Sequence, residues 1–280
     1  MKMKVYGCRG SMPLCHGGSS LYGGNTACIT LTSGKSTLIL DAGSGIHTLA
    51  QEMGINDPSK YTDGIGFKSN ILLGHLHVDH IIGLGTYAPA WEAGGETNVF
   101  TMSRNNEDLR KQIFGFFTPP YWPVTMHQVS HAAVTEIFPN KPFKIDDFTI
   151  TPFFSCHGDL TLSFHITDGK KTVVYMLDSE ISQMKKDGIA AVLKLCEDAD
   201  LVVFDASYSD EDYEKLHKGW GHSTVSCGVR LAKKSSPKKI LFSHFAQKYS
   251  DDELNGWTAK FDNSLQTEFI MAKDGLELNI

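Results

Sequence analysis

Several apolar segments of this 280-residue chain end in a histidine or an aspartate, and this repetition limits the folds that the chain can adopt. Near-continuous apolar runs are typical of strands that are covered on both faces. Ligand sites of layered sheets collect at the carboxyl ends of such strands. The pattern therefore predicts one site at one edge of a layered sheet. The apolar runs are residues 71–73, 153–154, 173–177, 201–204 and 240–242, and they lead to His75, His157, Asp178, Asp205 and His244.

The segment GHLHVDHIIG carries three histidines and one aspartate within residues 75–80. Burial of such groups without partners would cost on the order of 2–7 kcal/mol each, so a compensating ligand is expected. Imidazole nitrogens and carboxylate oxygens bind zinc, manganese or iron. Because alternate residues of an extended segment point the same way, His75 and His77 can share one metal ion, while Asp79 and His80 turn toward a second.

The side chains that can donate to metal ions are too many for a single four-coordinate ion. They fit two ions that share one carboxylate. Asp178 is the predicted bridge because, besides Asp79, it is the only candidate that can offer two oxygens at once. The candidates are His75, His77, Asp79, His80, His157, Asp178 and His244.

The chain has no internal repeat and no linker rich in Pro, Gly or Ser, so a single domain over residues 1–280 is predicted. Hairpins with turns at Gly34 and Gly169 come first, and strands alternate with helices later. This order predicts an α/β fold of two packed sheets with helices outside. Helices are predicted over residues 81–91, 105–115, 180–197, 224–234 and 251–261, and residues 267–280 are predicted to close the chain as a strand pair.

Composition excludes several classes of function. The net charge is −6 and there is no long basic block, which argues against general nucleic-acid binding. No apolar run approaches the ~18 residues that span a membrane, and the first residues lack the apolar core of a signal peptide. The six cysteines form no CxxC pair, so reduced thiols and a cytoplasmic location are expected.

The order of the candidate ligands resembles that of the metallo-β-lactamase-fold hydrolases. The HxHxDH motif of that family is found at residues 75–80, and its third histidine, bridging aspartate and last histidine correspond to His157, Asp178 and His244. Asp41 in LILDAG matches the family's early aspartate, which supports the metal ligands without binding the metal. The resemblance covers nearly the whole chain and implies a four-layer αββα sandwich with a two-metal site at one edge.

Within this superfamily, the segments GCRGSMP, YGGNTAC and GWGHST resemble the branch that contains tRNase Z and the cyclic-phosphodiester hydrolases. The chain departs from tRNase Z in two places. The interval from His157 to Asp178 has room only for a hairpin, whereas tRNase Z carries a protruding RNA-binding arm there. The glutamate that precedes the HST motif in tRNase Z is Asp205 here. The resemblance therefore implies a phosphodiesterase without the RNA-binding arm.

Charge and resemblance together predict the chemistry. Two divalent ions (zinc, with manganese or iron as alternatives), less the charges of Asp79, Asp178 and a bridging hydroxide, leave about +1, which favours a small anionic phosphodiester. Asp79 can orient the hydroxide as well as bind metal. In the resembling enzymes, the histidine at the position of His222 stabilises phosphoryl oxygens or assists the leaving group. Asp205 is predicted to hold the tautomer of that histidine.

The glycine-rich segments 7–11 and 23–26 are predicted to bring backbone N–H groups near the substrate. Ser11, Asn25 and Thr26 are the candidate substrate-binding residues of these segments.

Other interpretations stay open. The same hydroxide could open a lactone, a thioester or a β-lactam. A nuclease that acts on RNA or single-stranded DNA and a metal-bound binding protein without activity are further alternatives. His222 could merely precede a helix capped by Ser223, and Asp205 could merely end a strand. The aromatic segment 114–123 fits the core, a wall of the cleft or a contact in a homodimer.

Overall fold

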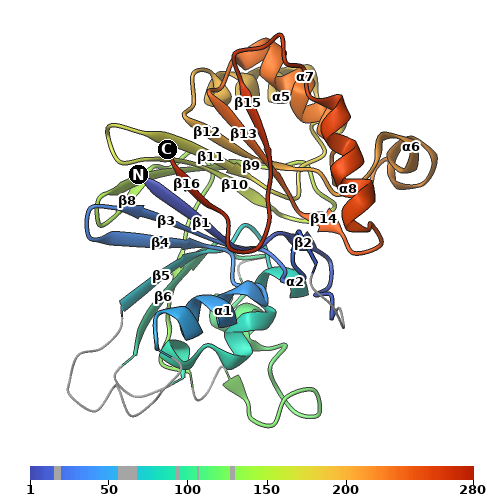
Figure 1. Ribbon diagram of the computed structural model, residues 1–280. Coiled ribbons are helices and arrows are strands. Elements are labelled where there is room, and N and C mark those ends of the chain that lie inside the picture. The colour runs from blue at the N-terminus through green and yellow to red at the C-terminus, as the bar shows by residue number, and fades with distance from the viewer. Residues whose placement is uncertain (16–19, 56–67, 92–94, 106, 127–129) are drawn as a thin grey trace.

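The computed structural model describes the chain except for residues 16–19, 56–67, 92–94, 106 and 127–129. In the described part, two seven-stranded sheets pack against each other and helices lie on their outer sides (Figure 1). The layers therefore follow the order α, β, β, α, and the predicted sandwich is confirmed.

The first sheet is mixed. Strands β4 to β7 run parallel, whereas the pairs β16–β1, β1–β3 and β3–β4 are antiparallel. The predicted hairpin turn at Gly34 joins β3 to β4, and this glycine has a φ of 59°. In the order β16–β1–β3–β4–β5–β6–β7, the strands are Glu277–Asn279, Lys2–Gly7, Cys28–Ser33, Ser36–Leu40, Lys68–Leu72, Glu96–Thr101 and Ala133–Glu136.

In the second sheet, β9, β11, β12, β13 and β15 run in one direction, and β8 and β10 run in the other. The interval between His157 and Asp178 is the hairpin β10–β11, as predicted from its length. In the order β15–β13–β12–β11–β10–β9–β8, the strands are Glu268–Met271, Lys239–Ser243, Leu201–Asp205, Thr172–Met176, Leu162–Thr167, Phe148–Phe154 and Phe143–Ile145.

Helices cover each sheet from its own side of the sandwich (Figure 1). Helix α1 (Gly45–Glu52) contacts β1 and β3, while α5 (Lys186–Cys196) packs against α7 (Val225–Ser235), which contacts β12 and β13. Two short strands, β2 (Arg9–Gly10) and β14 (Phe245–Ala246), pair in parallel where the chain leaves β1 and β13. The other α-helices of the described residues are α2 (Val78–Ile81), α3 (Leu109–Phe114), α6 (Asp210–Asp212) and α8 (Asp251–Trp257).

Strand periodicity divides the apolar side chains between two cores. Leu38 and Leu40 of β4 lie in the cluster between the sheets, whereas Ile39 between them packs with Ile46 and Leu49 of α1. All five are nearly or fully buried. This alternation of period two is the reason that one strand can stabilise two layers at once.

Several predicted helices are shorter than expected. The predicted helix 81–91 begins instead at Val78 and continues only as 3₁₀ turns over Ile82–Thr86 and Ala88–Ala90. Gly83 explains part of this, because a Cβ there would lie 2.3 Å from the Gly43 carbonyl oxygen.

The other helices have displaced ends. The predicted helix 105–115 is α3, with Asp108 as its N-cap, and the predicted helix 180–197 splits into a 3₁₀ turn at Ile181–Gln183 and α5. Helix 224–234 is α7, but its cap is Thr224 and not Ser223, whose Oγ donates to the Ser179 carbonyl. Helix 251–261 ends as α8 at Trp257, followed by a 3₁₀ turn.

The predicted pairing of the last two strands is wrong. Strand β15 pairs with β13 in the second sheet, and β16 pairs with β1 in the first. The segment between them resembles a hairpin turn in sequence, but the Asp274 carboxylate accepts the N–H groups of Gly24 and Asn25 instead. These hydrogen bonds tie the segment between β15 and β16 to the N-terminal part of the chain, so that the chain passes from the second sheet to the first.

Other predictions can be compared with the described residues. All six cysteines are free, as expected. No described helix has the length and apolar character needed to cross a membrane. In the aromatic segment, Phe114 and Phe117 are fully buried and belong to the core, whereas Tyr121 is 78% exposed.

Candidate metal centre

The carboxyl ends of β5, β9, β11, β12 and β13 meet at one edge of the sandwich, as their polar endings predicted. β5 leads to His75, β9 to His157 and β11 to Asp178, while β13 leads to His244. Asp205 is the last residue of β12. Strands of two different sheets thus contribute to one site, because their carboxyl ends lie at the same edge.

Backbone conformation at three of these positions turns the side chains into the site. Asp41 and His244 directly follow β4 and β13, Asp178 lies two residues after the end of β11, and the three have φ values of 58°, 68° and 52°. Non-glycine residues seldom adopt this left-handed conformation, and where they do the site is often functional. All three side chains are buried.

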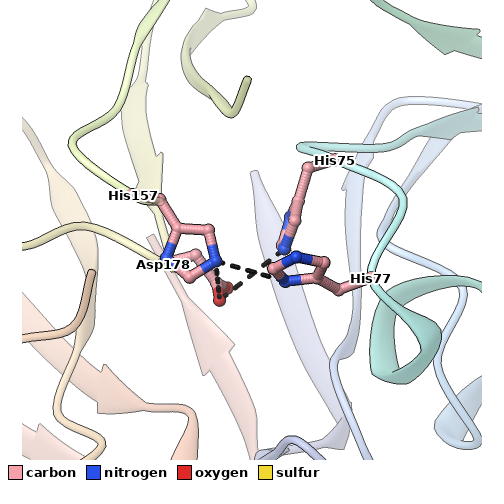
Figure 2. Close-up of side chains that lie close together, drawn as sticks. All are labelled: His75, His77, His157 and Asp178. Carbon is pink, nitrogen blue, oxygen red and sulfur yellow. Dashed lines mark hydrogen bonds and ion pairs between the residues drawn. The ribbon is translucent and has the colours of Figure 1, made fainter. Parts of the chain in front are cut away.

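His75, His77, His157 and Asp178 form a first cluster, which we call the outer group. One ligand atom from each lies within 4.8 Å of the others. Figure 2 shows the two histidines of the β5 loop facing His157 and Asp178 across a common centre. His157 Nε2 lies 3.2 Å from His77 Nδ1, and Asp178 Oδ1 lies 3.8 Å from His75 Nε2 and 3.7 Å from His157 Nε2.

Asp79, His80 and His244 form a second cluster, the inner group, also within 4.8 Å of one another. Asp178 reaches this group through its other oxygen, since Oδ2 lies 3.0 Å from His80 Nε2 and 3.3 Å from His244 Nε2. One carboxylate therefore faces the outer group with Oδ1 and the inner group with Oδ2. This is the geometry expected of a bridging ligand.

A third set of donors, Asp178, Asp205, His222 and His244, is equally close together. Asp205, however, is already occupied. Its Oδ1 accepts N–H groups from Ser207 and Ser223, and its Oδ2 accepts from the Asp178 N–H and from His222 Nδ1. Its hydrogen bonds favour a supporting role over metal binding.

The protein atoms of the two groups fit cations. His75 Nε2 and Asp178 Oδ2 are buried, and neither has a hydrogen-bond partner among the described residues. Such orphaned polar atoms are costly unless an ion satisfies them. His80 donates Nδ1–H to Asp41 and faces the Asp178 carboxylate with Nε2, 3.0 Å from Oδ2, an arrangement that a cation between Nε2 and the carboxylate would stabilise.

Electrostatics point the same way. Burial and the neighbouring His80 hold the pKa of His75 well below its usual value, which keeps this ring in the neutral form that binds metal. Burial also acts to lower the pKa of His80 and His244, but the carboxylates of Asp79 and Asp178 outweigh it and raise both pKa values. The inner group is thus a place where the protein attracts positive charge.

Hydrogen bonds to the far nitrogens fix the ring orientations. His80 Nδ1 donates to Asp41 Oδ2 at 2.8 Å, as the predicted supporting role of Asp41 requires. His244 Nδ1 lies 3.0 Å from Ser207 Oγ, and His157 Nδ1 lies 3.1 Å from the Gly221 carbonyl oxygen. Such partners set the tautomer and raise the basicity of a metal-binding imidazole.

Sequence reasoning missed two residues of this support. Tyr175 donates its hydroxyl to Asp41 Oδ2 at 2.6 Å, and Ser207 links His244 to the neighbourhood of His222. Ser207 follows Asp205 by two residues, which is a weak signal. Tyr175 lies within an apolar strand. A hydroxyl group in such a strand indicates that a buried polar partner is present, and this was the signal that the sequence offered.

His222 lies beside both groups but points its Nδ1 at Asp205, 2.8 Å away. Burial alone would lower its pKa, but the Asp205 carboxylate outweighs burial and raises the pKa of His222 to about 9. Asp205 therefore holds the Nδ1 proton, and Nε2 is the ring nitrogen that remains available for another hydrogen bond.

The three candidate substrate-binding residues make other contacts. The Ser11 N–H donates to Asp79 Oδ2 at 2.7 Å, and its side chain is exposed. Asn25 and Thr26 bond through their side chains to Ser44. Ser11 thus touches the centre through its backbone, and contact of the three with substrate stays a prediction.

A cavity of about 450 Å³ opens beside the outer group. Its size is in the range of small-molecule sites. Among its lining residues, Arg104 and Asp159 form an ion pair at 2.6 Å. The lining residues are His75, Leu76, His77, Met102, Arg104, Glu107, Gln112, Asp159 and Leu160.

Comparison with known proteins places the chain among metal-dependent hydrolases. Residues 37–245 match the family described as the Beta-lactamase superfamily domain. The chain is 26% identical over 245 residues to the probable metallo-hydrolase YhfI of Bacillus subtilis, covering 87% of this chain and 86% of that protein.

Solved structures share the fold. The crystal structure of YhfI from Bacillus subtilis has a TM-score of 0.70 at 22% identity and covers 99% of this chain and 98% of YhfI. A diphosphatase of the PhnP family gives 0.69 at 17% identity, covering 100% and 97% of the two chains. The short form of human tRNase Z gives 0.67 at 20% identity, covering 100% and 99%. These likenesses confirm the metallo-β-lactamase fold that the sequence predicted.

Proposed function

The chain belongs to the β-lactamase superfamily and has the metallo-β-lactamase fold, and we propose that it is a dinuclear phosphodiesterase acting on small or cyclic phosphodiesters. The observation that carries the proposal is the division of Asp178 between two donor groups, Oδ1 toward the outer and Oδ2 toward the inner. The relatives add support, because one is named a metallo-hydrolase and one structural neighbour a diphosphatase.

Each group would hold one divalent ion, with zinc favoured and manganese or iron as alternatives. Two such ions supply a hydroxide nucleophile at neutral pH and stabilise the oxygens of an in-line displacement. His75, His77 and His157 would hold one ion, and Asp79, His80 and His244 the other, with Asp178 shared.

The residues around the ions take distinct tasks. The Ser11 N–H donates to Asp79 Oδ2 and holds that oxygen in place. The other oxygen, Oδ1, is then available to orient the nucleophile. His222 keeps its proton on Nδ1 toward Asp205, and a second proton on Nε2 can be donated to a phosphoryl oxygen or to the leaving group. Such general acid assistance contributes roughly 10²–10⁴-fold to a rate.

The small cavity and the hairpin at β10–β11 support a small substrate over a folded RNA. A cavity of about 450 Å³ accommodates one leaving group of nucleoside size or smaller. The net charge of −6 also disfavours a long nucleic-acid path over the surface.

An activity screen tests the proposal. Protein stripped with a chelator and reloaded with zinc or manganese is assayed side by side on bis(p-nitrophenyl) phosphate, cyclic mononucleotides, short RNA, a lactone and a β-lactam. We expect turnover of bis(p-nitrophenyl) phosphate and of cyclic mononucleotides, and none without metal. Turnover confined to the lactone or the β-lactam, or to RNA, would replace the proposal by the corresponding alternative.

A further inference from the structure

A buried carboxylate outside the ligand set lies under the centre. Glu180 is 2% exposed and follows the buried Asp178–Ser179 pair after the end of β11. Its Oε1 accepts the Tyr213 hydroxyl at 2.6 Å and the Gly219 N–H at 2.7 Å, and its Oε2 accepts the Gly221 N–H at 2.7 Å. One side chain thus holds both ends of the segment 219–221.

The segment that Glu180 holds contacts two residues of the site. The carbonyl oxygen of Gly221 accepts from His157 Nδ1 at 3.1 Å, and His222 is the next residue. Glu180 also reaches the other side of His157, since its own N–H donates to the Cys156 carbonyl at 2.8 Å. Glu180 is therefore linked both to the carbonyl that accepts from His157 Nδ1 and to the residue that precedes His157 in the chain.

The backbone of this segment needs an anchor. Gly219 and Gly221 have φ values of 87° and 86°, in the left-handed region that glycine enters freely. A Cβ at Gly221 would lie 2.1 Å from His157 Nδ1, so the backbone approaches the ring as closely as glycine allows. Two flexible glycines so close to a metal-binding ring are held by hydrogen bonds and not by packing of side chains.

We infer that Glu180 is a positioning residue, which fixes the ring of His157 in the outer group and the approach of His222 by clamping the Gly219–Gly221 segment. The part concerning His222 rests on the proposed function, whereas the part concerning His157 requires only that the outer group binds metal.

The contacts of Glu180 suit a side chain with two accepting oxygens. Both oxygens of Glu180 accept from donors, and a glutamine would replace one oxygen by an NH₂ group that faces a glycine N–H. Loss of the hydrogen bond between Glu180 and the Gly221 N–H would let the Gly221 carbonyl move. The His157 ring, which donates to that carbonyl, would then lose its fixed orientation. Changes to partners of this kind commonly weaken metal affinity or activity by about 10–100-fold.

Zinc titration of metal-free protein in competition with a chelating dye tests the inference. We expect Glu180→Gln to weaken one of two zinc-binding steps by about 10–100-fold and to leave the other step near its original value. Glu253→Gln is the matched control, because Glu253 Oε2 also accepts a backbone N–H and a hydroxyl, from Ser250, but lies on exposed α8. Zinc binding of Glu180→Gln equal to that of the control would overturn the inference.

A second variant covers the case in which Glu180→Gln does not fold. A Cβ at Gly219 meets no atom within 4 Å, so Gly219→Ala strains only the backbone of the clamped segment. It should weaken the same zinc step to a smaller degree, and the ¹⁵N signals of the His157 ring should shift. An unchanged zinc step together with unshifted signals would contradict the positioning role.

These readouts separate the inference from the proposed function. A weakened zinc step in a protein that cleaves no phosphodiester would sustain the role of Glu180 toward His157 and reject the proposed activity. Phosphodiester turnover with unchanged kcat and unchanged zinc binding in Glu180→Gln would do the reverse. Parent protein that binds no zinc at all would reject both.

Discussion

The two halves of the metal centre are built differently, although they share Asp178. In the inner group, side chains hold the rings: Asp41 accepts from His80, and Ser207 lies beside His244 Nδ1. His80 and His244 are each 1% exposed. In the outer group, a main-chain carbonyl on a glycine segment holds His157, and His77 is exposed.

This difference has a chemical consequence. An anionic partner makes an imidazole more basic and holds its tautomer, whereas a neutral carbonyl on a movable segment does so less strongly. The inner group should therefore bind its ion more tightly, and the outer group should lose its ion first when a chelator is added. His75 and His77 of the outer group also line the cavity, so an ion held there would be the one that a substrate meets.

The largest effect is expected from the residue common to both halves. Asp178→Ala removes both bridging oxygens, so at least one metal ion per chain should be lost and phosphodiester turnover should fall to background. Elemental analysis of the purified variant measures the metal. Full occupancy would defeat the bridging assignment and with it the idea of two coupled halves.

Two further variants make that result specific. Asp178→Asn keeps one oxygen and suits the left-handed backbone at φ 52°, so it should show the same loss without backbone strain. Asp200→Ala removes another buried aspartate, which pairs with Lys171 and Lys238 just before the amino ends of β11 and β13, opposite to the ends that carry the site. Its metal content should equal that of the parent even if its stability is lower.

A smaller effect is expected at His222, which belongs to neither half. His222→Ala should retain both ions, because Asp205 and not a metal group holds this ring. Phosphodiesterase kcat should fall by about 10²–10⁴-fold, with little change in the metal content. Exposed His47 on α1 provides the control substitution, which should leave kcat unaltered. Unchanged turnover in His222→Ala would remove this residue from the mechanism.

The convergence of four candidate ligands at one edge could be predicted because each of the four follows a recognisable apolar strand. His75, His157, Asp178 and His244 needed only strand periodicity and the rule that carboxyl ends share an edge. The hydrogen-bond partners that distinguish the halves could not be predicted in this way. Tyr175 meets Asp41 across 134 positions of sequence, and Glu180 meets Gly221 across 41.

The fold was predictable where local signals and tertiary structure agree. The hairpin at Gly34 has both a turn residue and alternating strands, and it is present. The segment at Asp274 carries a similar turn signal, but its carboxylate bonds to Gly24 and Asn25 and the flanking strands enter different sheets. A single sequence contains no information on which distant N–H groups will compete for a carboxylate.

The most direct test of the difference between the halves is Asp41→Asn. This change leaves the outer group intact and removes the negative charge beside His80, whose Nδ1 and the Tyr175 hydroxyl both donate to one Asp41 oxygen. One zinc step should weaken by about 10–100-fold, and it should be the tighter of the two, unlike the step affected by Glu180→Gln. Asp146→Asn is the control, because Asp146 is also left-handed, at φ 48°, but pairs with Lys68. If Asp41→Asn and Glu180→Gln weakened the same step, the two halves would not be independently supported, and the contrast between a charged and a main-chain partner would have no effect on metal binding.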